Sequence, residues 1–204
     1  MNTELRWTSA DLEVLPDVDG NRYEIIDGEL YMSKQPHYHH QLTCSNITWL
    51  LGNWSIETGL GQTVGAPGII FAEDDDVAPD VVWCSYERLE KVLGDDGEFH
   101  AAPELVIEVL SPGRTNERRD RQAKLTLYSR RGVEEYWILD WMIGQVEVYR
   151  RRRRALRLME TLHKPETLTS PLLPGFSCLV AELFEYPNTT MKARAPRRRG
   201  ALKR

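Results

Sequence analysis

Apolar and polar positions along the chain repeat with two different periods, which together predict a mixture of strands and helices. Residues 22–26 and 29–33 are short apolar and aromatic runs on either side of Asp27-Gly28, and this arrangement predicts a hairpin because glycine tolerates a positive φ. In residues 40–58, apolar side chains recur at steps of three and four, which predicts a helix that ends at Gly59.

Shorter elements follow this helix. Residues 68–73 and 80–83 are apolar enough for strands, and residues 86–93 suit a short helix. The three aspartates at positions 74–76 lack the spacing and the glutamate of an EF-hand, so we expect a solvated loop there.

The centre of the chain has the clearest pattern. Residues 105–110, LVIEVL, form an almost continuous apolar run, as is typical of a buried central strand. Residues 117–131 predict a helix closed by Gly132, and residues 136–140, YWILD, predict a second buried strand. Strand, helix and strand of these lengths predict a βαβ unit with a parallel pair and a right-handed crossover.

Near the end of the chain, residues 145–149 and 155–162 predict a second hairpin, and residues 171–184 predict a mixed closing segment. The hairpin tip would carry five consecutive arginines: Arg150, Arg151, Arg152, Arg153 and Arg154. They are candidates for contacts with nucleic-acid phosphates, or they form a solvated tip. We predict one α/β domain over residues 1–186 and a basic, disordered tail over residues 187–204.

The composition suits a soluble protein with one sizeable core. The chain has 204 residues, of which 41% are hydrophobic and 28% charged. No apolar run approaches the roughly 20 residues that cross a bilayer, and the N-terminal segment has no apolar signal-peptide core. Cys44, Cys84 and Cys178 are odd in number and scattered, which suits a reducing compartment. We therefore expect a cytoplasmic protein with no membrane partner.

Charge is unevenly distributed. The whole chain carries −5, and the thirteen residues 192–204 contain seven Lys or Arg and no acid, which leaves −12 for residues 1–191. An acidic body argues against a broad DNA-binding face. It fits a site that gathers carboxylates around a metal ion.

Two acidic residues occupy positions where the local pattern favours an apolar side chain. Strand alternation places Glu108 on the same face as Val106 and Leu110, where a carboxylate is costly unless it is paired or bound to a metal. Asp80 follows Pro79 and opens a predicted strand. The alternatives are a strand-end glutamate that faces solvent or pairs with an arginine, and an aspartate that serves only the turn.

Lys124 is the third unusual position. On a helical wheel it falls near the middle of the apolar face formed by Ala123, Leu127 and Tyr128. A lysine there either extends to the edge of the face or points into a site. Asp120 lies one turn earlier and either orients Lys124 or forms a plain surface pair with it.

Together Glu108, Asp80 and Lys124 suggest one type of catalysed reaction. The βαβ unit places Glu108 on a strand and Lys124 on the inward face of the helix that covers it, and an adjacent strand could add Asp80. Two carboxylates and a lysine are what metal-assisted phosphodiester hydrolysis needs. The carboxylates suit Mg²⁺, which lowers the pKa of a bound water, and the lysine orients or deprotonates that water or stabilises the developing charge.

The motifs that carry this chemistry resemble those of the Uma-type restriction endonuclease family, within the PD-(D/E)xK nuclease superfamily. The resemblance covers most of residues 20–185 in the expected order, and its segments are jointly specific. They are YEIIDGEL (23–30), HHQL (39–42), APDVVW (78–83), PELVIEVLSPG (103–113), RRDRQAKLTLYSRRGVEEYWILD (118–140) and LLPGF (172–176).

The resemblance implies a role for each matching residue. Asp80 and Glu108 are then the metal-binding acids, with the backbone carbonyl of Val109 as a further ligand. Leu110 occupies the slot where the superfamily has its lysine, and Lys124 replaces that lysine from the following helix. Glu24 matches an acid that completes such sites, or it is a hairpin glutamate facing water.

Three further residues of the sequence bear on this interpretation of the site: His40, Cys44 and Ala78. His40 matches a family histidine near the helix start and would line the cleft. His40 and Cys44 share a helical face at a spacing that can bind zinc, but no full tetrahedral set is visible, so we expect a structural or solvated role. Ala78 stands where the family commonly has a polar residue, often glutamine.

We therefore predict an α/β fold with a restriction-endonuclease-like core, in which helices flank a central mixed β-sheet. The predicted function is a metal-dependent endonuclease that hydrolyses DNA phosphodiester bonds with Mg²⁺, or Mn²⁺, as cofactor. By analogy with the superfamily we expect a homodimer. The alternatives are a non-catalytic nucleic-acid-binding protein on the same fold, and a nuclease acting on RNA or another phosphodiester.

Overall fold

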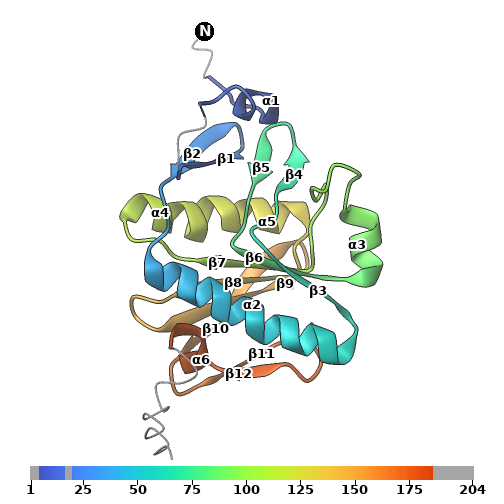
Figure 1. Cartoon of the computed structure of the whole chain (residues 1–204), viewed down its shortest axis with the longest axis vertical. Helices are drawn as coiled ribbons and strands as arrows, with labels where there is room; N and C mark the ends of the chain where they lie inside the picture. Colours follow the sequence, from blue (N-terminus) through green and yellow to red (C-terminus); the bar gives the residue numbers. More distant parts are fainter. Residues whose placement is uncertain (1–4, 17–19, 186–204) are drawn as a thin grey trace, which may run out of the picture.

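The computed structural model describes residues 5–16 and 20–185 (Figure 1). The predicted basic tail, residues 187–204, lies outside the described residues. The strands are β1 (Arg22–Ile26), β2 (Glu29–Ser33), β3 (Gly61–Gly65), β4 (Ile69–Ala72), β5 (Asp75–Val77), β6 (Val81–Ser85), β7 (Leu105–Val109), β8 (Glu135–Asp140), β9 (Gln145–Arg152), β10 (Ala155–His163), β11 (Thr167–Thr169) and β12 (Ser177–Leu179). The helices are α1 (Ser9–Leu12), α2 (Tyr38–Thr58), α3 (Tyr86–Val92), α4 (Arg114–Arg118), the π-helical segment η1 (Arg119–Lys124), α5 (Leu125–Arg131) and α6 (Val180–Phe184).

The largest sheet has six strands in the order β10-β9-β8-β7-β6-β3. Strands β7 and β8 are parallel, and all other neighbours in this sheet are antiparallel. The chain passes from β7 to β8 through α4, η1 and α5, as the predicted βαβ unit requires. The prediction of a central mixed sheet flanked by helices is therefore confirmed.

Alternation along the central strands gives this sheet two apolar faces. On one face Val81, Ile107 and Trp137 pack beneath α2, with Ile47 and Leu51 of that helix among their partners. The other face is covered by α4, η1 and α5 (Figure 1). Its core residues include Val106, Leu110, Leu127, Tyr128 and Tyr136.

A four-stranded sheet in the order β2-β1-β5-β4 stands at one end of the molecule (Figure 1). Asp27 and Gly28 connect β1 to β2 with φ values of 53° and 75°, which confirms the predicted hairpin turn. The expectation of a solvated loop at residues 74–76 is wrong, because Asp75 opens strand β5 and is buried. Its carboxylate accepts hydrogen bonds from Arg130, Arg131 and the backbone N–H of Asp27, so its burial is compensated.

The helix predicted over residues 117–131 is present but is not uniform. It consists of a short α-helix, six residues of π-helix and a second α-helix that ends at Gly132 with a φ of 97°. The short strands β3 and β5 were not predicted, since β3 has only Val64 as a strongly apolar residue between two glycines. Among the described residues, none of the helices combines the length and the hydropathy that a bilayer crossing requires.

Candidate active site

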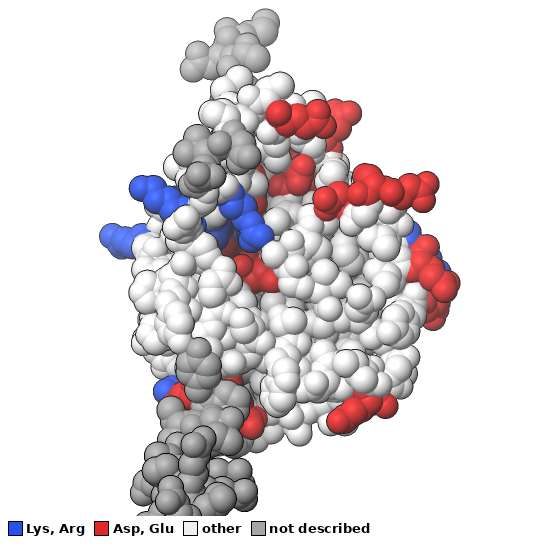
Figure 2. Space-filling model, in the orientation of Figure 1, with Lys and Arg blue, Asp and Glu red and all other residues white. Residues whose placement is uncertain are grey.

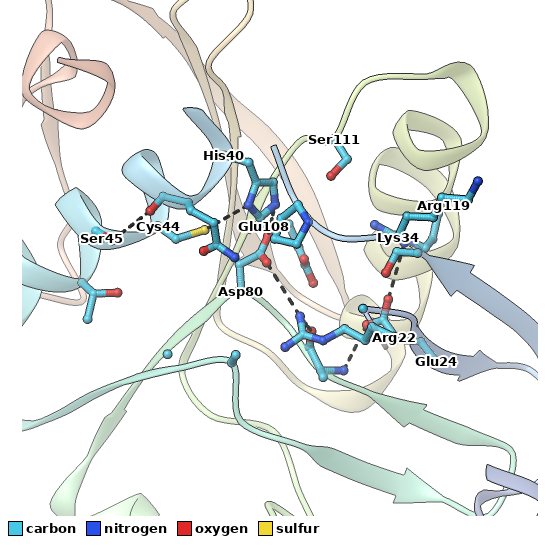
Figure 3. Close-up of a pocket in the computed structure, with 18 of the residues that line it drawn as sticks. Arg22, Glu24, Lys34, His40, Cys44, Ser45, Asp80, Glu108, Ser111 and Arg119 are labelled. Atoms are coloured by element: carbon cyan, nitrogen blue, oxygen red, sulfur yellow. Dashed lines mark hydrogen bonds and ion pairs between the residues drawn. The ribbon is translucent and has the colours of Figure 1, made fainter. Parts of the chain in front are cut away.

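A cavity of about 700 Å³ lies where the β1–β2 hairpin, the first turns of α2, the start of β6, the end of β7 and segment η1 meet (Figure 3). Acidic and basic side chains both line it: Arg22, Glu24, Lys34, Asp80, Glu108, Arg119 and Lys124. In the space-filling view, side chains of both charges lie next to one another near the centre of the face shown (Figure 2). The pocket therefore combines carboxylate ligands with cations that attract an anionic substrate.

Lys124 joins two carboxylates in this pocket. Its Nζ lies 2.7 Å from Oε1 of Glu24 and 2.8 Å from Oε1 of Glu108. The lysine is only 1% exposed, so it points into the site and does not extend to the edge of the helix. Glu24 is also buried, and its Oε1 accepts a hydrogen bond from the backbone N–H of Ala78. Of the two alternatives for Lys124, the structure therefore shows the one that points into a site, and Glu24 of the hairpin does not face water.

Asp80 reaches the same pocket through strand pairing. Strands β6 and β7 are antiparallel, with Val81 opposite Ile107, so the residue before β6 lies beside the end of β7. The Oδ2 atom of Asp80 accepts a hydrogen bond of 2.8 Å from the backbone N–H of Val109. Nε2 of His40 lies 3.3 Å from the same oxygen. The structure therefore brings Asp80, His40 and Glu108 to one place.

Segment η1 adds a buried ion pair behind the lysine. Arg119 donates from Nε to Oδ1 of Asp120 over 2.8 Å, and its Nη1 lies 3.7 Å from Oε2 of Glu24. Asp120 therefore pairs with Arg119, whereas the ion pairs of Lys124 go to Glu24 and Glu108. The expected direct contact between Asp120 and Lys124 is replaced by one with the neighbouring arginine.

Two buried tyrosines support these groups from the sheet side of the helix. Tyr128 donates from its hydroxyl to Oε1 of Glu108 over 2.9 Å. Tyr136 donates to the backbone carbonyl of Asp120 over 3.0 Å. Both tyrosines belong to the apolar core by burial, but each uses its hydroxyl to hold one part of the site.

Burial and nearby charges shift the pKa values of Glu108 and Asp80 in opposite directions. Burial, together with the nearby carboxylates of Asp80, Asp120 and Glu24, raises the pKa of Glu108 to about 8 in spite of Lys124. Burial also acts on Asp80, but the adjacent His40 and Lys124 outweigh it and hold the pKa of Asp80 below its usual range.

Lys124 itself stays charged. Burial alone would lower its pKa, but the carboxylates of Glu108 and Glu24 outweigh burial and raise the pKa above its ordinary value. At neutral pH it is therefore an ammonium group that donates hydrogen bonds.

The carboxylates have oxygen atoms to spare for a divalent cation. Their short hydrogen bonds use Oε1 of Glu24, Oδ2 of Asp80 and Oε1 of Glu108. Within the part of the chain that the structure describes, the second oxygens of Glu24 and Asp80 have ion pairs of 3.7 and 3.9 Å and no closer polar contact. The second oxygen of Glu108 takes part in no hydrogen bond or ion pair among the described residues. An all-oxygen set of this kind fits Mg²⁺ or Mn²⁺.

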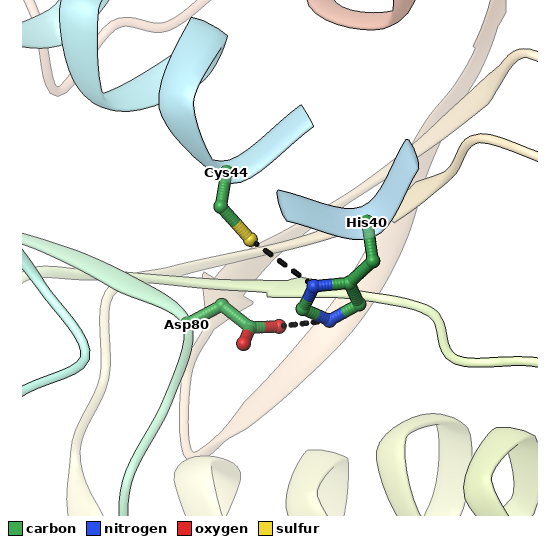
Figure 4. Close-up of side chains that lie close together, drawn as sticks. All are labelled: His40, Cys44 and Asp80. Carbon is green, nitrogen blue, oxygen red and sulfur yellow. Dashed lines mark hydrogen bonds and ion pairs between the residues drawn. The ribbon is translucent and has the colours of Figure 1, made fainter. Parts of the chain in front are cut away.

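The other histidines of the sequence cluster lie away from these carboxylates. His37 and His39 are exposed and stack on Trp141, with ring centroids 4.9 and 5.2 Å from it. His40 is buried, and its Nδ1 lies 3.5 Å from Sγ of Cys44 (Figure 4). The expected face shared by His40 and Cys44 is therefore present, and it borders the pocket.

The five consecutive arginines at positions 150–154 lie away from the pocket. Strand β9 is antiparallel to β8, so Gln145 pairs with Asp140 near the pocket end of the sheet and Arg150 pairs with Glu135 at the opposite end. Arg150 forms ion pairs with Glu135 and Glu160. Arg151 donates to backbone carbonyls, including that of Val133. Arg152, Arg153 and Arg154 are exposed, and only the last two form the turn. The structure does not bring this run to the candidate site.

Tyr128 and Arg119 are among the side chains of the site that the sequence did not reveal. The hydroxyl of Tyr128 lies on the apolar wheel position that packing alone explains, so nothing in the pattern marked it. Arg119 was missed because an α-helical wheel places it about 140° from Lys124. The dense charge of Arg118, Arg119 and Asp120 was the available signal.

A comparison with solved structures supports the fold. A solved structure from Anabaena variabilis, described as "a putative nuclease belonging to DUF820", is similar with a TM-score of 0.68 and 18% sequence identity. The similarity covers 87% of this chain and 97% of that one, and at this identity it shows the fold alone. None of the curated proteins compared with the chain matches it.

The sequence also matches a family as a whole. The profile of the Uma2 family, described as "Putative restriction endonuclease", matches residues 9–181, a range that contains every carboxylate and base of the pocket. Because this match extends over most of the chain, the protein belongs to the Uma2 family.

Proposed function

We propose that the protein is a metal-dependent endonuclease that hydrolyses DNA phosphodiester bonds, with Mg²⁺ or Mn²⁺ as its ion. The observation that carries this proposal is the bridge that Lys124 forms between Glu24 and Glu108, with Asp80 beside it in one pocket. A buried lysine held by two carboxylates costs free energy in a purely structural role, and such arrangements are concentrated at functional sites.

Asp80 and Glu108 would hold the ion, and the free oxygen of Glu108 supports that assignment. The backbone carbonyl of Val109, next to Glu108, is a further candidate ligand. A bound Mg²⁺ would lower the pKa of a water molecule and neutralise charge on the phosphate. Replacement of the proton on Glu108 by the ion would leave Asp80 and Glu108 both as carboxylates.

The protonated state of Lys124 defines its role. A lysine with a raised pKa is already protonated at neutral pH and cannot accept a proton from water, so it orients water or a phosphate oxygen by donating hydrogen bonds and stabilises the negative charge that develops. Tyr128 and His40 are positioning residues, because they hold Glu108 and Asp80 respectively. Arg119 stabilises Glu24 from the other side.

The cations at the pocket support a phosphodiester substrate. Arg22 and Lys34 line the pocket along with Lys124 and Arg119, which suits a backbone of negative charges. They are better placed for this contact than Arg150 and Arg151, whose side chains are used within the fold. The homodimer expected from the sequence stays a prediction.

The experiment that tests the function compares wild type with Lys124→Met on supercoiled plasmid and on single-stranded DNA, with Mg²⁺ or Mn²⁺. Methionine keeps the length of the side chain and removes its charge. We expect cleavage by wild type that EDTA abolishes, and a loss of at least about 100-fold in Lys124→Met. Lys91→Met is the matched control, because among the described residues Lys91 forms its ion pair with exposed Glu87 on α3, and it should cleave like wild type.

The other outcomes identify the alternatives. DNA binding without cleavage, unaffected by EDTA, would indicate a non-catalytic binding protein. Metal-dependent cleavage of RNA with DNA left intact would indicate a ribonuclease on the same fold. Equal cleavage by wild type and Lys124→Met would contradict the role given to Lys124.

A further inference from the structure

A second group of metal-ligand atoms lies in the same pocket, on the side of α2. His40 and Cys44 are one helical turn apart on this helix, and Asp80 approaches them from the start of β6 (Figure 4). One ligand atom from each residue lies within 4.8 Å of the other two. The thiol, the imidazole and the carboxylate are already held together by contacts of 3.5 and 3.3 Å through the two nitrogens of His40.

The chemistry of this group differs from that of the all-oxygen set. Sulfur and imidazole nitrogen are ligands that Zn²⁺ prefers and Mg²⁺ does not. Three protein ligands with a fourth position open to the pocket form the usual pattern of an accessible zinc site. Because Cys44 and His40 both line the cavity, an ion and a water molecule can reach them from solvent.

The surroundings of Cys44 set it apart from the other cysteines. Cys84 and Cys178 belong to the two apolar cores, and Cys84 lies beside Glu104, whereas Cys44 at the edge of one core has both a histidine and an aspartate within reach of one ion. Burial, together with the charges of Asp80 and Glu108, raises the pKa of the Cys44 thiol. This environment disfavours a free thiolate nucleophile, and a divalent cation would supply the missing positive charge.

We propose that His40, Cys44 and Asp80 form a binding site for zinc. One nitrogen of His40 coordinates the ion, so the His40 side chain no longer bridges Cys44 and Asp80 through both of its nitrogens. Cys44 coordinates as a thiolate, and its proton passes to solvent. Asp80 belongs to this site and to the proposed magnesium site, and zinc therefore competes with Mg²⁺. The zinc site does not rest on the proposed nuclease activity, whereas the competition does.

The first test uses Co²⁺ alone as a spectroscopic substitute for zinc, added to the metal-free full-length protein. We expect a thiolate-to-cobalt charge-transfer absorption that Zn²⁺ titrates away. Cys44→Ser keeps a hydrogen-bond donor of similar size beside His40 but should abolish this absorption. Cys178→Ala is the matched control, because it removes a cysteine from the apolar core, and it should retain the absorption.

A second variant protects the test against a folding defect in the first. His40→Gln should weaken zinc binding by more than about 100-fold, because loss of even a hydrogen-bond partner of a ligand costs roughly 10- to 100-fold. Absence of the charge-transfer band in wild type, or its persistence in Cys44→Ser, would overturn the proposal. Thermal unfolding of each variant establishes that it is native before the titration.

The second test measures zinc inhibition of magnesium-dependent cleavage. We expect micromolar zinc to inhibit cleavage by wild type. In Cys44→Ser, the cleavage rate with zinc divided by the rate without zinc should be closer to one than in wild type. Inhibition that is equal in the two proteins would refute competition through this site. A cobalt–thiolate band in a protein that cleaves no DNA would support the zinc site and refute the proposed nuclease function.

Discussion

Glu108 is a carboxyl group that the fold surrounds with other carboxyl groups. The residue is 2% exposed, and Asp80, Asp120 and Glu24 all act to raise its pKa. The pKa of about 8 means that the metal-free protein keeps a proton on Glu108 at neutral pH. The unfolded chain, in which a glutamate has a pKa near the ordinary 4.5, releases that proton. Folding and protonation are therefore linked at this residue.

This linkage predicts a pH dependence of stability. Between pH 5 and 8 the folded state binds the extra proton, so the contribution of Glu108 to the free energy of unfolding falls as the pH rises, and it levels off above about 8. Glu108→Gln keeps the shape and cannot titrate. In EDTA, the free energy of unfolding of wild type relative to Glu108→Gln should fall by up to about 1.4 kcal/mol per pH unit in this range.

Urea unfolding of both proteins at pH 5, 6.5 and 8 measures the difference. The two proteins share all other titrating groups, so their shared pH dependence cancels. A difference that stays constant over this range would contradict the raised pKa.

The residues of the site differ in how far sequence could predict them. Glu108 and Lys124 were recognisable because each is a charged side chain on an apolar face, and burial of an unpaired charge is costly. Asp80 was supported by the family resemblance, but its position beside Glu108 depends on the pairing of β6 with β7. Strand pairing between segments separated along the chain is not encoded by local periodicity.

At the scale of elements, the π-helical segment decides which side chains enter the pocket. In an α-helix, Arg119 and Lys124 would point about 140° apart. The wider π-helical turn brings residues five apart closer to one face, and Arg119, Asp120 and Lys124 are all buried. The hydroxyl of Tyr136 bonds the carbonyl of Asp120, within this irregular turn. No pattern of apolar residues predicts such a segment, which explains the missed arginine.

Tyr136→Phe should therefore loosen this segment. Loss of the buried hydrogen bond should lower the free energy of unfolding by about 1 kcal/mol and speed amide hydrogen exchange within residues 119–124. Thr58→Val is the matched control, because it removes a hydroxyl that donates to the backbone carbonyl of Trp54 on α2 and does not contact this segment. Hydrogen exchange with mass spectrometry compares the two variants. Unchanged exchange of the segment in Tyr136→Phe would show that the tyrosine does not hold it.

At the scale of the molecule, the two ends of the six-stranded sheet each carry a separate group of cations. The pocket end has Arg22 and Lys34 at its mouth, and the other end has the exposed arginines of the β9–β10 hairpin. The sequence predicted this hairpin and its charge. It could not predict that the hairpin points away from the site, because that depends on the antiparallel register of β8 and β9.

This arrangement predicts which cations contact DNA during cleavage. Lys34→Gln should weaken binding and reduce the salt dependence of affinity by a slope of about one, because one phosphate contact is lost. Arg153→Gln removes one charge from the far hairpin and should leave the slope unchanged. Fluorescence anisotropy with a short duplex, in Ca²⁺ to prevent turnover, over a series of salt concentrations measures both slopes. A larger effect of Arg153→Gln would place the bound DNA at the wrong end of the sheet for the proposed site.

The candidate site also has a consequence for the synthesis of the protein. Its charged groups come from the hairpin β1–β2, from β6 and β7, and from segment η1, which extend from Glu24 to Lys124 along the chain. Strand β8, which carries Tyr136 and pairs with β7, emerges from the ribosome later still. A nascent chain that ends before β8 lacks Tyr136 and the partner strand of β7, so the proposed activity can begin only after most of the chain has been synthesised and folded.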